Sequence, residues 1–236
     1  MVKYSHKKIC VILHLYYIDL WGYFLPYLKN IDTDFDLYVT ITEGHSGVFT
    51  DIQDEIISEF PKANIYILPN RGMDIAPFFY IMNEIVLSGR TYDTIIKLHS
   101  KKSLKHNDNI GDVWRAQLTE ALLGSVSKLQ NNFYACTQTN QTMVGSSQWV
   151  ITQKYWGFEH EYFSQEITFP EYEFIGGTMF MVNFNLMMDW FVSENIYKRF
   201  YNKFDDGYFV NDTIAHYFER LFGCLVTLKG NKILKV

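Results

Sequence analysis

Short, nearly continuous apolar runs alternate with segments of helical periodicity over the first hundred residues. The apolar runs have the length of buried strands and lie at residues 9–14, 36–41, 64–68 and 92–98. Between them, apolar residues recur every three or four positions and predict helices at residues 17–28, at 50–60 and from about residue 74. Strands that alternate with helices at this spacing predict a parallel sheet with right-handed crossovers.

The alternation is less regular beyond residue 100. The pattern predicts further helices at residues 111–124, 186–192 and 209–222, the last ended by Gly223, and further strands at residues 143–151, 178–184 and 225–228. No internal repeat, low-complexity tract or linker interrupts the sequence. We therefore expect one α/β domain over residues 1–236, with a mostly parallel central sheet flanked by helices.

Composition supports a folded domain and excludes a strongly basic one. The 236 residues are 48% hydrophobic and 17% aromatic, so the chain can bury a sizeable core. The formal net charge of −5 gives no overall basic field, and we expect no nucleic-acid partner. Any polyanion must therefore be bound by a local cluster of cations.

The cysteines and the first apolar stretch indicate in which cellular compartment we expect the protein. Cys10, Cys136 and Cys224 are odd in number and far apart, which favours free thiols in a reducing cytoplasm. Asp19 and Pro26 interrupt the first apolar stretch, which makes it a poor signal peptide and a poor membrane-spanning helix. We expect a cytoplasmic protein, and the aromatic excess leaves open peripheral contact with the inner face of the membrane.

The candidate site follows from where ligands bind in parallel sheets, which is beyond the carboxyl ends of the strands. Residues at these ends are His14, Leu15 and Tyr16, residues 40–43, Asn70 to Asp74, and His99 to Ser103. Arg71 precedes a glycine and a predicted helix N-terminus, a combination that favours an anion. Lys101 and Lys102 add positive charge at a neighbouring strand end, so we expect a phosphate or diphosphate to bind here.

Each of these residues also has a structural explanation. A Lys-Lys pair is commonly a solvated turn, and Arg71 can cap a sheet edge. Asp74 can N-cap its helix. His14 ends an apolar strand and can be a core histidine with its hydrogen bonds satisfied.

Five segments of the chain resemble blocks of the rhamnan synthesis F family. They lie at residues 15–22, 69–78, 96–103, 176–180 and 215–222. Members of that family are associated with the synthesis of rhamnose-containing cell-surface polysaccharides and O-antigens, as glycosyltransferases that use nucleotide-activated sugars. The resemblance implies transfer of a sugar, L-rhamnose from dTDP-L-rhamnose, to a growing bacterial polysaccharide, with residues 1–103 binding the nucleotide sugar and residues 104–236 the acceptor.

A weaker resemblance connects the chain to glycosyltransferases of the GT-A fold, a Rossmann-like architecture. Those enzymes have an Asn-Arg-Gly turn like residues 70–72, and their next strand usually ends in an Asp-x-Asp metal site. Here that strand ends in residues 99–102, His-Ser-Lys-Lys, without the carboxylates. Lysines repel a divalent cation and can offset the charge of a diphosphate themselves. We therefore expect metal-independent transfer with no cofactor besides the donor.

Inverting transfer by a single displacement needs a base that deprotonates the acceptor hydroxyl. GT-A enzymes commonly place this carboxylate at the start of a late helix, where the chain offers Asp205, Asp206 and Asp212, with Glu173 more distant. Asp212 is the first choice because the family resemblance resumes directly after it. Its structural alternative is a helix-start carboxylate that the helix dipole favours.

The complete expectation assigns residues to three roles. The catalytic residues are Asp212 and His216. The donor-binding residues are His14, Tyr16, Asn70, Arg71, Gly72, Asp74, His99, Ser100, Lys101 and Lys102. The acceptor-binding residues are Gly176, Gly177, Thr178 and Glu219, and the acceptor is a glycan or a lipid-linked glycan. His216 and Glu219 share one helix face with Asp212, so they can also support the base.

Two other function classes fit the same features. One is a non-catalytic sugar- or nucleotide-binding module of a polysaccharide assembly complex, since a degenerate transferase also lacks metal carboxylates. The other is a sugar-phosphate transferase, which also needs an anion-binding rim. Release of a nucleoside monophosphate rather than a diphosphate distinguishes the latter.

Overall fold

A mostly parallel sheet forms the centre of the protein. The computed structural model describes residues 8–44, 49–102, 110–207, 209 and 213–236. Within them, seven strands pair in the order β3-β2-β1-β4-β8-β5-β9. The strands are β1 (Ile9–Leu15), β2 (Phe35–Thr42), β3 (Asn64–Leu68), β4 (Thr94–His99), β5 (Met143–Gly145), β8 (Phe180–Asn183) and β9 (Ile233–Lys235). Only β8 among them runs antiparallel to its neighbours, so the predicted α/β fold is confirmed.

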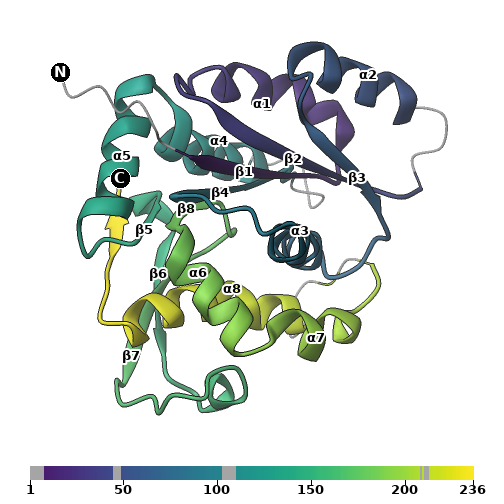
Figure 1. Cartoon of the computed structure of the whole chain (residues 1–236). Coiled ribbons are helices and arrows are strands. Elements are labelled where there is room, and N and C mark those ends of the chain that lie inside the picture. Colours follow the sequence, from purple (N-terminus) through teal and green to yellow (C-terminus); the bar gives the residue numbers. More distant parts are fainter. Residues whose placement is uncertain (1–7, 45–48, 103–109, 208, 210–212) are drawn as a thin grey trace.

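Helices cover both faces of this sheet. Those described are α1 (Trp21–Leu28), α2 (Phe49–Glu59), α3 (Ile75–Ser88), α4 (Ile110–Leu123), α5 (Val126–Gln138), α6 (Phe184–Ser193), α7 (Ile196–Phe200) and α8 (Ile214–Leu228). Figure 1 shows α1, α2 and α4 on one side of the sheet and α3, α6 and α8 on the other. Every residue of β1 and β4 is buried, as expected for central strands with helices on both faces.

Aromatic rings fill the space between the sheet and the α3–α8 layer. Phe79 of α3 meets Phe218 of α8 edge-on, with ring centroids 4.7 Å apart, and Phe222 contacts Phe180 of β8 at 5.3 Å. Edge-to-face packing of this kind adds to the stabilisation from burial. None of the described helices is long and apolar enough to cross a bilayer, and the three cysteines are free and buried.

A two-stranded antiparallel ribbon, β6 (Val150–Lys154) and β7 (Glu171–Ile175), packs against α8, a helix for which two predictions need correction. The sequence predicted that Gly223 ends the last helix and that residues 225–228 form a strand. Both predictions are wrong, because α8 continues to Leu228. A Cβ atom at Gly223 would lie 2.0 Å from the carbonyl oxygen of Glu173, so this glycine permits close packing against β7.

The middle of the chain was also predicted incompletely. The single strand expected at residues 143–151 is instead β5, a 3-10 turn at Ser147–Trp149 and the start of β6, which belong to two different sheets. Helix α5 and strand β7 were not predicted. The apolar run alone does not reveal the change of direction at the turn.

Candidate functional site

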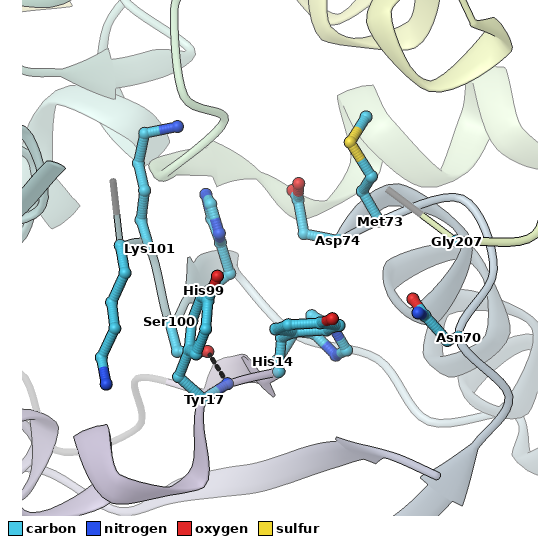
Figure 2. Close-up of a pocket in the computed structure, with 11 residues that line it drawn as sticks. His14, Tyr17, Asn70, Met73, Asp74, His99, Ser100, Lys101 and Gly207 are labelled. Atoms are coloured by element: carbon cyan, nitrogen blue, oxygen red, sulfur yellow. Dashed lines mark hydrogen bonds between the residues drawn. The ribbon is translucent and has the colours of Figure 1, made fainter. Parts of the chain in front are cut away.

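A cavity of about 130 Å³ lies at the carboxyl ends of β1 and β4, beside the turn that leads into α3 (Figure 2). It is lined by His14, Tyr16, Tyr17, Asn70, Met73, Asp74, His99, Ser100, Lys101, Lys102 and Gly207. Eight of the ten predicted donor-binding residues are therefore brought together, while Arg71 and Gly72 are not part of the lining. The Tyr17 N–H donates to Ser100 Oγ at 2.8 Å and joins the ends of the two strands.

His14 is held by two threonines of β2. Its Nδ1 lies 2.9 Å from Thr40 Oγ1, and its Nε2 lies 3.4 Å from Thr42 Oγ1. Burial lowers the pKa of His14 to about 3, so the ring is neutral at physiological pH. His14 therefore has the satisfied hydrogen bonds of a core histidine and also forms part of the cavity wall.

His99 occupies the position of β4 that pairs with His14. Its Nε2 donates to the carbonyl oxygen of Gly177 at 2.7 Å. Because a carbonyl only accepts, this bond fixes the proton on Nε2 and leaves a lone pair on Nδ1. Burial lowers the pKa of His99 to about 4, so this ring is also neutral.

A buried ion pair forms one side of the cavity. The Asp74 carboxylate accepts from Lys97 Nζ and from Thr178 Oγ1. Lys97 Nζ also contacts Thr178 Oγ1 at 3.0 Å and the Thr178 carbonyl oxygen at 3.2 Å. Asp74 stands at the N-cap position of α3, but its side chain makes no capping hydrogen bond, so the capping alternative is wrong.

Burial and neighbouring groups shift the pKa values of both residues of this pair. The side chain of Lys97 is only 1% exposed, and burial lowers its pKa. Burial by itself raises the pKa of Asp74, but His99, the Lys97 ammonium and the Thr178 hydroxyl outweigh it and lower that pKa well below its usual range. Lys97 was not predicted as a site residue, although a lysine within an apolar strand is a sequence signal for a buried ionic partner.

The turn between β7 and β8 connects these groups to α8. Gly177 and Thr178 adopt left-handed φ values of 85° and 51°. The Gly177 N–H donates to Glu219 Oε1 at 2.6 Å, while its carbonyl accepts from His99. A Cβ atom at Gly177 would lie 2.9 Å from the indole of Trp114, so the turn needs glycine there. The Gly176 carbonyl oxygen accepts from the Trp114 indole N–H at 3.4 Å. Three of the residues predicted to bind the acceptor, Gly176, Gly177 and Thr178, therefore lie together in this turn.

Lys101 and Lys102 extend from the end of β4 into different surroundings. The Lys101 ammonium lies 3.7 Å from the centre of the Trp114 ring, a cation–π contact, and burial lowers its pKa. Lys102 forms an ion pair with Asp19, and its side chain is 31% exposed. The buried Arg115 of α4 donates to the Lys101 carbonyl oxygen and thereby fixes this segment.

The turn after β3 is tied to the segment that follows α7. Arg71 Nε lies 2.7 Å from Asp206 Oδ1, and the Gly72 N–H donates to the Asp205 carbonyl at 2.9 Å. Gly207 then donates to the Asn70 carbonyl at 2.8 Å and lines the cavity. Arg71 is thus occupied by Asp206, one of the carboxylates considered as a base.

The remaining predicted catalytic residues are placed as follows. Asp212 lies outside the described residues. His216 Nδ1 lies 2.8 Å from Thr213 Oγ1 in a capping box at the start of α8. Glu173 pairs with Lys235 at 2.6 Å on the β6–β7 ribbon. Across the described residues, no group of three or more His, Cys, Asp or Glu side chains is arranged to hold a metal ion.

Comparison with known proteins identifies the family. The profile of rhamnan synthesis protein F (RgpF) matches residues 1–230, nearly the whole chain. The chain belongs to the rhamnan synthesis protein F family. This membership links it to polysaccharide biosynthesis and agrees with the resemblance found in the sequence.

Two curated relatives are also similar to part of the chain. Both are named uncharacterized protein WxcX, from the B100 and ATCC 33913 strains of Xanthomonas campestris pv. campestris. Each is 31% identical over 115 residues, which is 49% of this chain. The chain spans only 16% of the length of these relatives.

Proposed function

We propose that this chain is a glycosyltransferase that moves a sugar from a nucleotide-sugar donor to a growing polysaccharide. The observation that carries the proposal is the cavity at the carboxyl ends of β1 and β4, whose lining includes both Lys101 and Lys102. In an open α/β sheet this is where ligands bind. In sugar transfer, negative charge develops on the diphosphate as it leaves, and two ammonium groups stabilise that charge.

The size of the cavity limits which part of the donor it encloses. Pockets that bury a whole drug-sized ligand measure about 300–1,000 Å³. A cavity of about 130 Å³ can enclose one group, such as the diphosphate, with the nucleoside extending over its rim. The polar wall of His14, His99 and Ser100 suits such a charged, hydrogen-bonding group.

The finer assignments follow from the family. We propose dTDP-L-rhamnose as the donor, a bacterial surface glycan or lipid-linked glycan as the acceptor, and metal-independent inverting transfer. Lys101 and Lys102 stand where GT-A enzymes usually carry metal-binding carboxylates. These lysines then perform the charge compensation that a divalent cation otherwise supplies.

A thermal-shift experiment with nucleotides tests the site. We expect dTDP and dTDP-sugars to raise the melting temperature equally with and without EDTA, because ligand binding stabilises the folded state by mass action. Lys101→Ala and Lys102→Ala should each reduce the affinity about tenfold, the effect of losing roughly 1.4 kcal/mol. Lys128→Ala is the matched control, since Lys128 of α5 also pairs with a carboxylate, Glu120 of α4, but is not part of the cavity lining.

The outcome separates the three function classes. Transfer of the sugar with release of a nucleoside diphosphate supports the glycosyltransferase. Release of a nucleoside monophosphate would instead indicate a sugar-phosphate transferase, and binding without turnover a binding module. Loss of turnover in EDTA, with recovery in manganese, would contradict the metal-independent mechanism.

A further inference from the structure

The carboxylate of Glu219 lies where α8 passes the Gly177–Thr178 turn. Its Oε1 accepts the Gly177 N–H at 2.6 Å. Within the described part of the chain this is the hydrogen bond that holds the carboxylate, and it leaves Oε2 for another partner. The residue is partly buried, so the carboxylate is fixed in position but retains some access to solvent.

Glu219 also lies near the charged groups of the cavity. The electrostatic influence of Asp74 and Lys101 reaches its carboxylate, with opposite signs. Figure 2 shows the side chains of Asp74, His99 and Lys101 pointing to the same side of the cavity. His99 contacts the carbonyl oxygen of Gly177 and Glu219 accepts its N–H, so both side chains are held by the same turn.

Most other groups near the cavity are already engaged, and His99, whose Nδ1 keeps a lone pair, has its pKa lowered to about 4 by burial, which makes it a weak base. The Asp74 carboxylate is bound by Lys97 and Thr178, and both nitrogens of His14 face threonine hydroxyls. Further away, Asp206 is paired with Arg71. An acceptor of a proton must have a lone pair that is not committed to a cation, and among these groups Glu219 fits that requirement best.

We propose that Glu219 is the catalytic base of the sugar transfer, an assignment that rests on the proposed function. The acceptor hydroxyl oxygen forms a bond to the anomeric carbon of the donor while the bond from that carbon to the diphosphate breaks. The electron pair of the broken bond leaves with the nucleoside diphosphate, close to Lys101. The hydroxyl proton passes to Glu219 Oε2, and water takes it after the products leave.

The surroundings of Glu219 favour this role. Burial raises the pKa of Glu219, and Asp74 raises it further, against the lowering effects of the Gly177 N–H, Lys101 and Arg220. A carboxylate with a raised pKa accepts a proton more readily than an ordinary glutamate. The rate of transfer should therefore fall as the pH drops through a pKa above the ordinary glutamate value.

The decisive variant is Glu219→Gln, in which the amide oxygen can still accept the Gly177 N–H but cannot take a proton. We expect the transfer rate to fall at least 100-fold, in the range typical of losing a general base, while the dissociation constant for dTDP changes less than twofold. Glu219→Ala should recover part of its rate in added formate, a small carboxylate that can enter the space left by the side chain. Glu120→Gln, an exposed glutamate of α4, is the control and should transfer at the rate of the unmodified protein.

Several results would overturn this assignment. Transfer at the normal rate by Glu219→Gln would by itself rule out Glu219 as the base. Loss of dTDP binding together with transfer in Glu219→Gln, with no rescue of Glu219→Ala by formate, would rule it out as well. Loss of transfer in Asp212→Asn but not in Glu219→Gln would instead make Asp212 the base. If the unmodified protein binds dTDP-sugars but transfers none of them to any glycan tested, the proposed function fails and this assignment fails with it.

Discussion

At the residue scale, the site depends on charges that are held inside the protein. Lys97, Asp74 and Thr178 come from β4, the start of α3 and the β7–β8 turn, and they satisfy one another within a few ångströms. A buried pair of this kind is costly to break, because removing one partner leaves the other charge without compensation. The pair therefore fixes Asp74 beside the cavity more firmly than a helix cap would.

Replacing Lys97 tests this explanation. Lys97→Met should lower the free energy of unfolding by about 3–5 kcal/mol, because it leaves the Asp74 carboxylate buried and unpaired. Adding Asp74→Asn to this variant should recover part of the loss. Urea unfolding measures both effects.

A surface pair provides the control for Lys97. Lys235 pairs with Glu173 at 2.6 Å, but its side chain is 46% exposed. Lys235→Met should therefore cost less than about 1 kcal/mol. Equal losses for Lys97→Met and Lys235→Met would show that the buried pair does not stabilise this part of the fold.

At the element scale, two left-handed turns and one long helix bring the site together. Gly72 and Met73 precede α3, Gly177 and Thr178 precede β8, and all four have positive φ. These turns direct Asp74 and Thr178 toward each other from segments 104 residues apart in the sequence. Helix α8 then brings Glu219 to the second turn, which requires close packing of the helix against β7.

Alanine substitution of two helical glycines tests that packing, and we expect opposite effects on the stability of the protein. Gly223→Ala should destabilise the protein by about 1–3 kcal/mol, because its Cβ would collide with the backbone of β7. Gly22→Ala in α1 should stabilise it by about 0.5–1 kcal/mol, because no atom lies within 4 Å of that Cβ and alanine favours the helix. Denaturation curves of the two variants give the comparison, and a stabilising Gly223→Ala would contradict the close packing of α8.

At the scale of the whole molecule, the antiparallel strand β8 joins the two halves of the chain. It pairs with β4 on one side and β5 on the other, so the turn before it reaches the end of β4. Polar residues from both halves are thereby buried together. Folding of the entire domain is consequently coupled to the protonation of these groups.

The pH dependence of stability should show this coupling. His14 and His99 have pKa values of about 3 and 4 in the folded state, lower than the ordinary value near 6.5. Between pH 6.5 and 4 the unfolded chain binds these two protons and the folded chain does not, so stability falls as the pH decreases. The combined slope should approach about 2.7 kcal/mol per pH unit near pH 5.

Substitution of the two histidines tests whether they cause this pH dependence of stability. His14→Asn and His99→Gln should each remove about half of it, and the double variant most of it. Urea unfolding at several pH values between 4 and 7 measures the slope. A slope that persists in the double variant would mean that other groups control the acid sensitivity of the fold.

The sequence by itself determined the α/β fold and most of the cavity lining. Continuous apolar runs identify buried parallel strands, and parallel strands place the residues that follow them at one edge of the sheet. His14, Asn70, His99 and Lys101 could therefore be assigned to one site from local patterns alone. The end of α8 was predicted wrongly because a glycine that stops a helix and one that allows close packing look the same in sequence.

Only the tertiary structure decided which charges are paired and which remain available. Arg71 faces Asp206, Asp74 faces Lys97, and Glu219 reaches the Gly177 turn, each through a contact between segments far apart in the chain. Local patterns carry no information about such contacts, because they depend on the packing of β8 and α8 against the first four strands. Protonation and reactivity follow from these contacts, and they therefore required the folded structure.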